Sequence, residues 1–257
     1  DPYKSDTNRV LEGIQSGTYV PLRMSPLIII STVLTHAFGG SAGREGAALQ
    51  LGGSLGGTIG KWLKLDEYDQ KVMIMCGMSA AFSALFGTPL TATIFAMEVV
   101  SIGIMEYAAL VPCAIASLIA REMADLVGAR AEQFPVPASV TLDIKSGALI
   151  VLLALLCAAV SILFCEVLHR TERLFKSRMK NPWIRVVVGA LLVIVLAKVL
   201  GTTDYLGAGM NIVERAIHGE TEPAAFLLKI IFTAITLSCG FKGGEIVPTL
   251  FVGATFG

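Results

Sequence analysis

The chain has 257 residues, of which 54% are hydrophobic and 16% charged, and its mean hydropathy is +0.71. Soluble proteins carry about 25% charged residues, so this composition excludes a soluble globule and a disordered chain. Equal numbers of basic and acidic residues, 20 of each, leave no overall field that would attract nucleic acid. An integral membrane protein remains, and its 26 glycines exceed what plain spanning helices need.

The first apolar segments differ in length. Residues 24–43 are uncharged and long enough to span a bilayer core of about 30 Å, whereas residues 46–60 are a shorter, glycine-rich segment. Residues 72–97 also lack charge, but Gly87, Thr88 and Pro89 fall in the middle. Because proline favours the first turn of a helix, we predict one helix ending near Phe86 and another beginning near Thr88. A further helix is predicted over residues 107–126.

A polar break with two prolines covers residues 128–145. We predict a linker there, between part of a first membrane repeat in residues 1–127 and a truncated second repeat in residues 146–257. Residues 146–165 form an uninterrupted span, and the basic stretch from His169 to Arg185 that follows belongs on the cytoplasmic side by the positive-inside rule. Shorter apolar segments follow at 186–197 and 230–239, with a short helix near 211–218. Short and broken helices are typical of transporters.

The two ends of the sequence differ in character. The start, DPYKSDTNRV, is polar and indicates no cleavable signal peptide. The end, FVGATFG, stops inside an apolar run, so we expect a fragment cut at both ends of a longer protein.

Two glycine-rich stretches align at an offset of 200 residues: GSAGREGAALQLGGSLGG from Gly40 and GFKGGEIVPTLFVGATFG from Gly240. The matching positions are Gly40/Gly240, Gly43/Gly243, Glu45/Glu245, Gly53/Gly253 and Gly57/Gly257. Each motif follows an apolar helix with a threonine near its end, Thr35 or Thr236. We infer two structurally repeated halves.

Each motif is interpreted as a glycine-rich loop that opens a short helix inside the membrane. Glycine leaves backbone N–H groups unobstructed, and a helix N-terminus carries about half a positive charge, so such a loop binds an anion without a cationic side chain. The two motifs would converge near the midplane. An alternative is that Gly53/Gly57 and Gly253/Gly257 serve only close helix packing. That alternative leaves the glutamate beside the earlier glycines unexplained.

Glu45 is the main candidate for chemistry, because a carboxylate inside a bilayer is costly unless it is functional, paired or protonated. At a helix N-terminus it occupies the place of an external anion, and once protonated it would lose that electrostatic hold and leave. It would thereby exchange a proton against an anion. The alternative is an N-terminal cap in an ion pair with Arg44.

At these residues the chain resembles the CLC family of chloride channels and proton-coupled anion antiporters. GREG at residues 43–46 is similar to that family's GREGP motif, with Ala47 in place of proline, and GGEIVP at 243–248 is similar to its GxFxP motif. The resemblance covers the whole chain, including the TPL turn at 88–90. It implies an all-α polytopic fold with inverted repeats and short, re-entrant helices, and a homodimer with one pathway per subunit.

The same resemblance assigns residues. Glu45 would be the gating and proton-coupling glutamate, with backbone amides around Ile246 and Val247 coordinating the anion. The full set of anion-binding residues implied is Gly43, Arg44, Gly46, Gly243, Gly244, Glu245, Ile246 and Val247.

Three departures from the family pattern qualify what the resemblance implies about the substrate. The inner proton-relay position falls on Val99, with Glu98 one residue before it, and Ile246 replaces the phenylalanine of GxFxP. Both departures resemble the fluoride/proton antiporter branch. The family's first anion-binding motif and its late tyrosine lie outside this chain, so the most direct determinants of halide choice are missing.

Other polar residues have simpler interpretations. We expect His36 to be packed or helix-bonded rather than a proton relay, Glu98 to pair or pack, and Glu106 to mark a helix end. Lys242 would either pair with Glu245 or raise the local electrostatic potential for anions, and the sequence does not decide between these two roles. The cysteines lie in apolar stretches without metal-ligand spacing and are expected to be packed thiols: Cys76, Cys113, Cys157, Cys165 and Cys239.

The function that these residues favour is proton-coupled fluoride antiport across the cell membrane by a multi-pass protein. The alternatives are a chloride/proton antiporter or passive chloride channel on the same fold, and an inactive membrane assembly module. An enzyme is not expected, since the chain has no H-E-x-x-H, G-x-S-x-G or Walker motif. No cofactor, metal or nucleic acid is expected; the partners are a halide, a proton and the bilayer.

Overall fold

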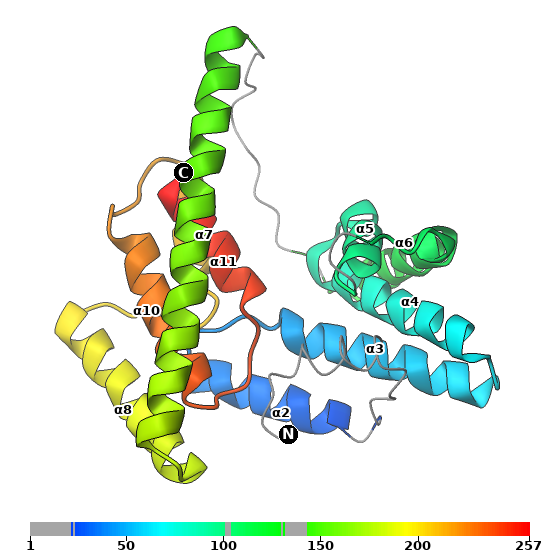
Figure 1. Ribbon diagram of the computed structural model, residues 1–257, viewed down its shortest axis with the longest axis horizontal. Helices are drawn as coiled ribbons and strands as arrows, with labels where there is room; N and C mark the ends of the chain where they lie inside the picture. The colour runs from blue at the N-terminus through cyan, green and yellow to red at the C-terminus, as the bar shows by residue number, and fades with distance from the viewer. Residues whose placement is uncertain (1–21, 23, 101–103, 130, 132–142) are drawn as a thin grey trace. The chain divides into compact units, whose positions relative to one another are not determined.

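The structure is a computed structural model that describes residues 22, 24–100, 104–129, 131 and 143–257. Secondary structure within these residues is helical (Figure 1). The helices are α2 Met24–Ala37, α3 Glu45–Trp62, α4 Glu67–Phe86, α5 Pro89–Glu98, the 3₁₀ turn η1 Tyr107–Ala109, α6 Leu110–Leu126, α7 Ile144–Arg178, α8 Pro182–Leu200, α9 Met210–Ile217, α10 Ala225–Ser238 and α11 Ile246–Phe256. The predicted linker lies mostly outside the described residues.

The chain divides into two compact units. Unit 1 contains residues 1–30 and 45–133, and unit 2 contains residues 31–44 and 134–257. The segment 31–44, which ends just before Glu45, therefore belongs with the second half of the chain. Whether the halves are the predicted repeats with a linker between them stays a prediction.

Unit 1 is organised around α4, which packs against α3, α5 and α6. The α3–α4 contact is close because Gly52 faces the backbone of Gly77, and Gly56 faces the backbone of Met73. The glycines that bring these two helices together are thus Gly52 and Gly56. Each lies one residue before a member of the Gly53/Gly57 pair that the sequence suggested for helix packing. At Gly253, in the second motif, an added Cβ would meet nothing within 4 Å.

The predicted break between α4 and α5 is confirmed. Gly87 ends α4 in the left-handed conformation with φ of 69°, and Pro89 starts α5 after Thr88. The guanidinium of Arg121 on α6 donates to the carbonyl oxygen of Gly87 and so ties this turn to the neighbouring helix.

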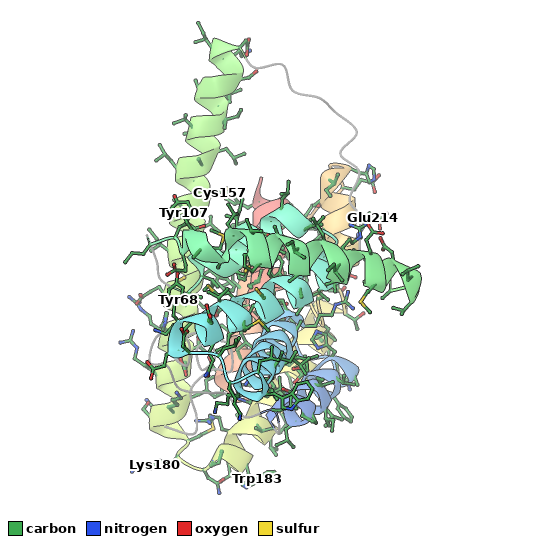
Figure 2. The ribbon with its side chains drawn as sticks, turned by 90° about the vertical axis from the view of Figure 1, so that its right-hand side faces the viewer. Tyr68, Tyr107, Cys157, Lys180, Trp183 and Glu214 are labelled. Atoms are coloured by element: carbon green, nitrogen blue, oxygen red, sulfur yellow. The ribbon has the colours of Figure 1, made fainter. Side chains whose placement is uncertain are left out.

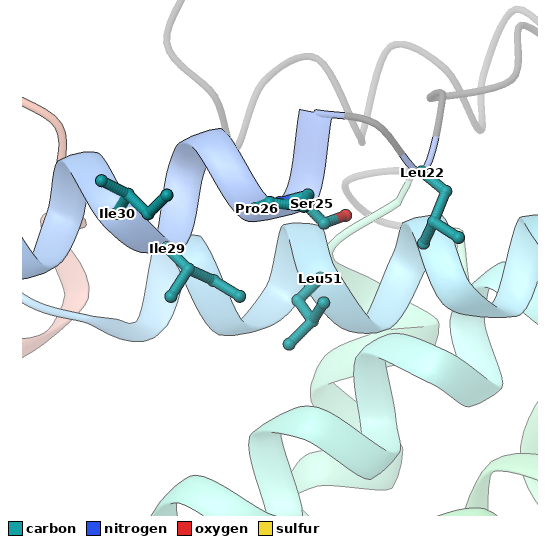
Figure 3. Close-up of a pocket in the computed structure, with 6 residues that line it drawn as sticks. All are labelled: Leu22, Ser25, Pro26, Ile29, Ile30 and Leu51. Atoms are coloured by element: carbon teal, nitrogen blue, oxygen red, sulfur yellow. The ribbon is translucent and has the colours of Figure 1, made fainter.

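A separate apolar groove of about 340 Å³ in unit 1 is lined by Leu22, Ser25, Pro26, Ile29, Ile30 and Leu51 (Figure 3).

Unit 2 is built on the long helix α7, against which α10 and α11 pack (Figure 1). Asp143 caps α7 by accepting a hydrogen bond from the Ser146 amide at 2.8 Å, and the hydrogen bonds from Ser146 lower the pKa of this carboxyl. We expected a span ending near residue 165, but α7 continues to Arg178. At about 1.5 Å per residue, a helix of 35 residues is about 52 Å long and extends well past a bilayer core.

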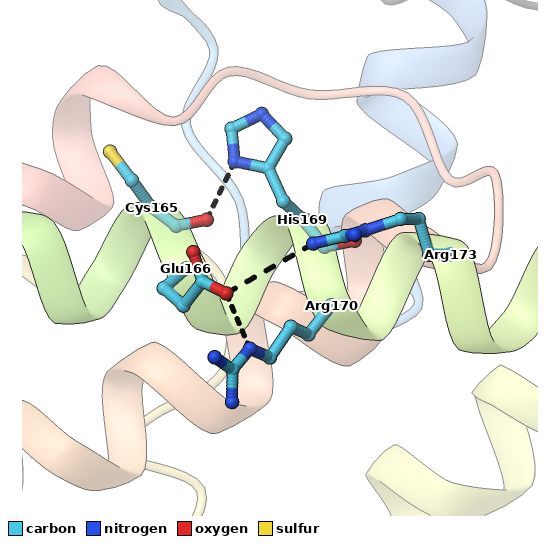
Figure 4. Close-up of polar contacts among 5 residues, drawn as sticks. All are labelled: Cys165, Glu166, His169, Arg170 and Arg173. Carbon is cyan, nitrogen blue, oxygen red and sulfur yellow. Dashed lines mark hydrogen bonds and ion pairs between the residues drawn. The ribbon is translucent and has the colours of Figure 1, made fainter.

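The basic stretch expected after the span therefore lies largely on the same helix. Its charges are partly neutralised locally: Arg170 pairs with Glu166, and Arg173 lies 4.0 Å from Glu166 (Figure 4). Lys176 pairs with Glu172 at 2.7 Å. The first basic group, His169, is bonded through Nδ1 to the Cys165 carbonyl at 2.7 Å. Lys180 lies in the turn to α8, and Trp183 lies in the first turn of α8 (Figure 2).

The core of unit 2 surrounds Phe232 and Phe251, which also contact Tyr205. Lys229 on α10 is fully buried in this core. Its ammonium donates to the carbonyl oxygens of Tyr205 at 3.3 Å and Gly207 at 2.8 Å, and lies 5.0 Å from the centroid of the Phe251 ring. These contacts fasten the loop before α9 to α10 and α11.

Three helices of the described residues are long and apolar enough to cross a membrane: Tyr107–Leu126, Ile144–Arg178 and Pro182–Leu200. The helices that flank the two glycine motifs, α2, α10 and α11, are apolar but shorter. This mixture of long and short apolar helices matches the expected all-α membrane fold.

Candidate anion pathway at the paired glycine loops

The two glycine motifs meet in the structure. Gly43 and Gly244 form an isolated antiparallel bridge, in which each amide donates to the other residue's carbonyl oxygen at 2.8 Å. Close approach of the two backbones requires small residues here, since a Cβ on Gly243 would lie 3.2 Å from the Gly43 carbonyl oxygen and would also clash with Ala42. The two loops therefore contact one another at this bridge, and their convergence near the midplane as anion sites stays a prediction.

The two loops share a conformation, but their register differs from the one expected. Helices α2 and α10 both have 14 residues, and the glycine two residues beyond each helix has a positive φ: 78° at Gly39 and 98° at Gly240. The next helices begin at Glu45 and Ile246. Every one of these features recurs at an offset of 201 residues, not 200.

The error in the offset has a simple cause. Two glycines stand next to one another at 39–40, 52–53 and 56–57 in and just before the first motif, and at 243–244 in the second motif. An offset of 200 residues and an offset of 201 residues therefore each align several glycines. In the structural register Glu45 corresponds to Ile246, and Glu245 corresponds to Arg44. The second motif thus has an apolar side chain where the first has its carboxylate.

A cluster of hydroxyl groups holds the first loop against α10. The Ser41 amide donates to Thr236 Oγ1 at 3.1 Å, and the Ser41 hydroxyl lies 3.1 Å from Thr233 Oγ1. All three residues are buried. Sequence reasoning noticed Thr236 but missed Ser41 and Thr233. The signal was present, because Thr32/Thr233 and Thr35/Thr236 are two further matches at the offset of 201.

Glu45 begins α3 two residues after the bridge, and its side chain is fully buried. The N-terminus of an 18-residue helix favours a negative charge, which offsets part of the cost of burying this carboxylate. Gly46 is also buried, whereas Arg44 on the other side is exposed. The site therefore offers a carboxylate and helix N-terminal amides in the same few residues.

The second motif presents its amides without a buried carboxylate. Ile246 is the first residue of α11, Val247 and Pro248 are buried, and Glu245 is exposed, as is its counterpart Arg44. The Glu245 carbonyl accepts hydrogen bonds from the amide of Thr249 at 3.0 Å and from its hydroxyl at 2.8 Å. The Glu245 side chain therefore does not repeat the environment of Glu45.

Three other polar candidates lie outside this loop pair. His36 is bonded through Nδ1 to the Thr32 carbonyl at 2.9 Å, as a helix-bonded histidine would be. Glu98 is exposed at the end of α5, with Val99 after it. Glu106 accepts a hydrogen bond from the Tyr68 hydroxyl at 2.7 Å. It directly precedes η1, so it marks the start of a helical segment rather than the end of one.

The five thiols differ in burial, and Cys157 on α7 is half-buried. Cys76, Cys113 and Cys239 are buried, and the sulfur atoms of Cys76 and Cys113 lie 3.9 Å apart. Cys165 is exposed on α7, so the expectation that it is packed is wrong within this chain. Among the described residues no group of three or more histidine, cysteine or acidic side chains is arranged to hold a metal ion.

Residues 4–257 match the family model described as voltage gated chloride channel. The chain belongs to the CLC family. A CLC relative from Pseudomonas syringae pv. tomato, a chloride/fluoride channel protein, is 33% identical over all of this chain and 58% of its own length. The voltage-gated ClC-type chloride channel ClcB of Escherichia coli is 27% identical, over 96% of this chain and 59% of its own length.

Two solved structures share the fold of this chain. A CLC-type fluoride/proton antiporter superposes with a TM-score of 0.92 at 36% identity, covering 97% of this chain and 64% of the other. A slow cyanobacterial Cl⁻/H⁺ antiporter superposes with a TM-score of 0.74 at 19% identity, covering 95% and 59%. The chain thus spans about three fifths of the length of these CLC proteins.

Proposed function

We propose that this chain forms part of a CLC antiporter that exchanges fluoride for protons across a membrane. The observation that carries the proposal is the position of Glu45, a fully buried carboxylate at the start of α3, two residues after the bridged glycines. The 36% identity to a CLC-type fluoride/proton antiporter supports fluoride over chloride.

The proposed mechanism follows from helix-end electrostatics. Each helix start by itself would bind an anion through backbone amides: Gly46 in the first turn of α3, and Ile246 and Val247 in the first turn of α11. Gly43, Gly243 and Gly244 would leave room for the anion. The ionised Glu45 would compete with the anion for the positive potential at the N-terminus of α3. Protonation removes its charge, releases the side chain and admits fluoride, so one proton is exchanged against the anion.

The exposed charges would act at longer range. Arg44 raises the potential beside the first loop, and Glu245 lowers it beside the second, so their contribution depends on ionic strength. The membrane of residence is proposed to be the cell membrane, and the assembled protein a homodimer with one pathway per subunit.

The proposal is tested in the full-length protein reconstituted in liposomes, with fluoride efflux, chloride efflux and proton uptake recorded from the same vesicles. We expect fluoride to leave faster than chloride and to drive proton uptake. Chloride efflux as fast as fluoride efflux would contradict the fluoride assignment and favour a chloride transporter of the same fold.

Glu45→Gln isolates the role of the carboxylate. We expect fluoride-driven proton uptake to fall at least about 100-fold, because an amide neither ionises nor carries a proton at neutral pH. Glu67→Gln is the matched control: Glu67 is also the first residue of a helix, α4, but it is exposed. Normal proton uptake in Glu45→Gln would remove Glu45 from the mechanism.

A further inference from the structure

Lys229 on α10 is a buried cation that the proposed mechanism does not use. Among the described residues, Lys229 and Glu45 are the two charged side chains that are fully buried. Burying a charge is unfavourable unless its surroundings stabilise it, so such a residue in a membrane protein has a functional or structural reason. Glu45 has that reason in the proposed proton coupling, and Lys229 needs one of its own.

The first motif shows that the fold does not need a cation at this helix position. At the offset of 201 residues that relates α2 to α10, Lys229 corresponds to Ile28, which is also buried. Glu45, in turn, corresponds to Ile246. Each of the two buried charges therefore has an isoleucine as its counterpart in the other motif, and helix packing alone does not explain Lys229.

The aromatic neighbour of Lys229 occurs in the same motif only. The Lys229 ammonium lies 5.0 Å from the centroid of the Phe251 ring on α11. In the first motif Phe251 corresponds to Gln50, which is buried and whose amide has no hydrogen-bond partner among the described residues. The second motif thus has a cation and an aromatic face suited to it, where the first has Ile28 and an amide.

The surroundings of the Lys229 ammonium stabilise its charged form. The ammonium donates to the carbonyl oxygens of Tyr205 at 3.3 Å and Gly207 at 2.8 Å, in addition to its contact with Phe251. Carbonyl oxygens and the face of an aromatic ring are the negative ends of dipoles and quadrupoles, which attract a cation but have no net charge. These contacts therefore hold the ammonium in place without neutralising it.

The acidic groups near this loop are exposed to solvent. Asp204 pairs with Arg215 at 3.0 Å, and Glu222, which lies near Tyr205, is exposed. Water and salt weaken the field of an exposed charge much more than that of a buried one. The charge of Lys229 therefore acts over a longer distance inside the protein than these carboxylates do.

Phe251 relates the ammonium to the start of α11, where the proposed mechanism places an anion. Phe251 follows Ile246 by five positions, which correspond to about 7.5 Å along a helix axis. Helical side chains lean toward the N-terminus, so the Phe251 ring is displaced from its own backbone toward Ile246. A charge beside this ring lies on the order of 10 Å from the first turn of α11. At that separation and an effective dielectric constant of about 20, it changes the affinity for a monovalent anion roughly 10-fold.

We propose that Lys229 is a fixed positive charge that strengthens anion binding at the start of α11 without touching the anion. The end of a helix contributes only partial charges, and Lys229 adds a full charge behind it. The two motifs are thereby made unequal: the first has a buried carboxylate at its helix start, and the second has a buried cation against its helix. This inference rests on the proposed anion site at α11 and names a residue that sets the affinity of that site.

The test measures the dissociation constants of fluoride and chloride for the full-length protein in detergent by isothermal titration calorimetry. Lys229→Met removes the charge and keeps a long, flexible side chain. We expect the dissociation constant of whichever halide binds measurably to rise about 10-fold. Because the field of a charge acts equally on monovalent anions, the ratio of the two constants should stay within about twofold of wild type.

Two further variants separate the charge from the hydrogen bonds. Lys229→Gln and Lys229→Arg both keep N–H donors for the two carbonyl oxygens, but only Lys229→Arg keeps the charge. We expect Lys229→Arg to bind within about threefold of wild type and Lys229→Gln to bind as weakly as Lys229→Met. This comparison decides the question even if Lys229→Met folds poorly. Unchanged affinity in Lys229→Met, or equal affinities in the Gln and Arg variants, would overturn the proposal.

Lys198→Met is the matched control, because Lys198 lies in the last turn of α8 in the same unit but is exposed. At high ionic strength its charge is screened, and we expect both dissociation constants to stay within about twofold of wild type. A loss of affinity as large as that in Lys229→Met would contradict a special effect of the buried charge.

Failure of this inference is distinguishable from failure of the proposed function. If Glu45→Gln abolishes proton uptake and Lys229→Met binds fluoride with unchanged affinity, only the role of Lys229 is wrong. If the wild-type protein binds chloride and not fluoride, the fluoride assignment is wrong, and a 10-fold loss of chloride affinity in Lys229→Met still supports the role of Lys229.

Discussion

Glu45 and Ile246 occupy the same place in two loops of the same conformation, yet only one of them ionises. Each is the first residue of a helix that begins two residues after a bridged glycine. An apolar Ile246 leaves the N-terminus of α11 without a buried carboxylate, since Glu245 before it is exposed, whereas Glu45 supplies a buried carboxylate to α3. In the proposed mechanism, this difference of one side chain would make the first loop responsive to protons and leave the second loop attractive to anions.

The hydroxyl cluster of Ser41, Thr233 and Thr236 holds the loop that leads into Glu45. In Thr236→Val the Ser41 amide loses its acceptor at a buried position, which costs about 1–3 kcal/mol. We expect a lower thermal unfolding temperature in detergent and slower fluoride efflux, because the start of α3 is less well positioned.

A matched control separates this effect from a general loss of a helix hydroxyl. Thr255 bonds only within α11, to the Phe251 carbonyl at 2.9 Å and the Val252 carbonyl at 3.4 Å among the described residues. Thr255→Val should leave both the unfolding temperature and the efflux close to wild type. Equal effects of the two substitutions would argue against a positioning role for Thr236.

At the scale of elements, α3 is held by its glycine face. Gly52 and Gly77 face one another so closely that a Cβ on either would meet the other's backbone. Helices α2, α10 and α11 are shorter than a bilayer core requires, so their depth depends on such packing and on the loop bridge rather than on hydrophobic length.

Gly77→Ala tests this contact. Because the obstructing atoms are backbone, the helices must separate, and we expect a destabilisation of about 1–3 kcal/mol, measured as a drop in the thermal unfolding temperature of the purified protein. Gly147→Ala on α7, where an added Cβ meets nothing within 4 Å, is expected to be neutral or slightly stabilising. A Gly77→Ala protein as stable as wild type would mean that α3 and α4 do not pack this closely.

Sequence reasoning predicted most helix boundaries, since their signals are local. The Gly87–Pro89 break ends one helix and starts the next, and the short helix near residue 211 is present as α9. The length of α7 was missed because hydropathy falls where Glu166 begins the charged part, although nothing in that stretch breaks a helix. A fall in hydropathy indicates where a helix leaves the membrane. The helix itself ends only where the residues no longer favour helical backbone.

At the scale of the whole molecule, the chain is about three fifths of the length of the CLC proteins that it resembles. Much of the surface of α7 and α8 is apolar and exposed within the described residues. Such surface is suited to lipid, to further segments of a longer protein or to a second subunit.

The proposed homodimer is tested with the full-length protein. We expect light scattering after size exclusion in detergent to give twice the mass of one chain after correction for bound detergent, at several protein concentrations. A monomer that retains fluoride-driven proton uptake in liposomes would contradict the dimer and leave the transport proposal intact.

By itself the sequence determined that this is a membrane protein with short and long helices, that two glycine-rich loops recur, and that Glu45 is the carboxylate to examine. These properties depend on composition and local pattern. Only the tertiary structure decided that Gly43 pairs with Gly244, that Ile246 and not Glu245 is the counterpart of Glu45, and that Gln50 is buried without a partner among the described residues. Doubled glycines make the register ambiguous in sequence, and a hydrogen bond between residues two hundred positions apart exists only once the chain has folded.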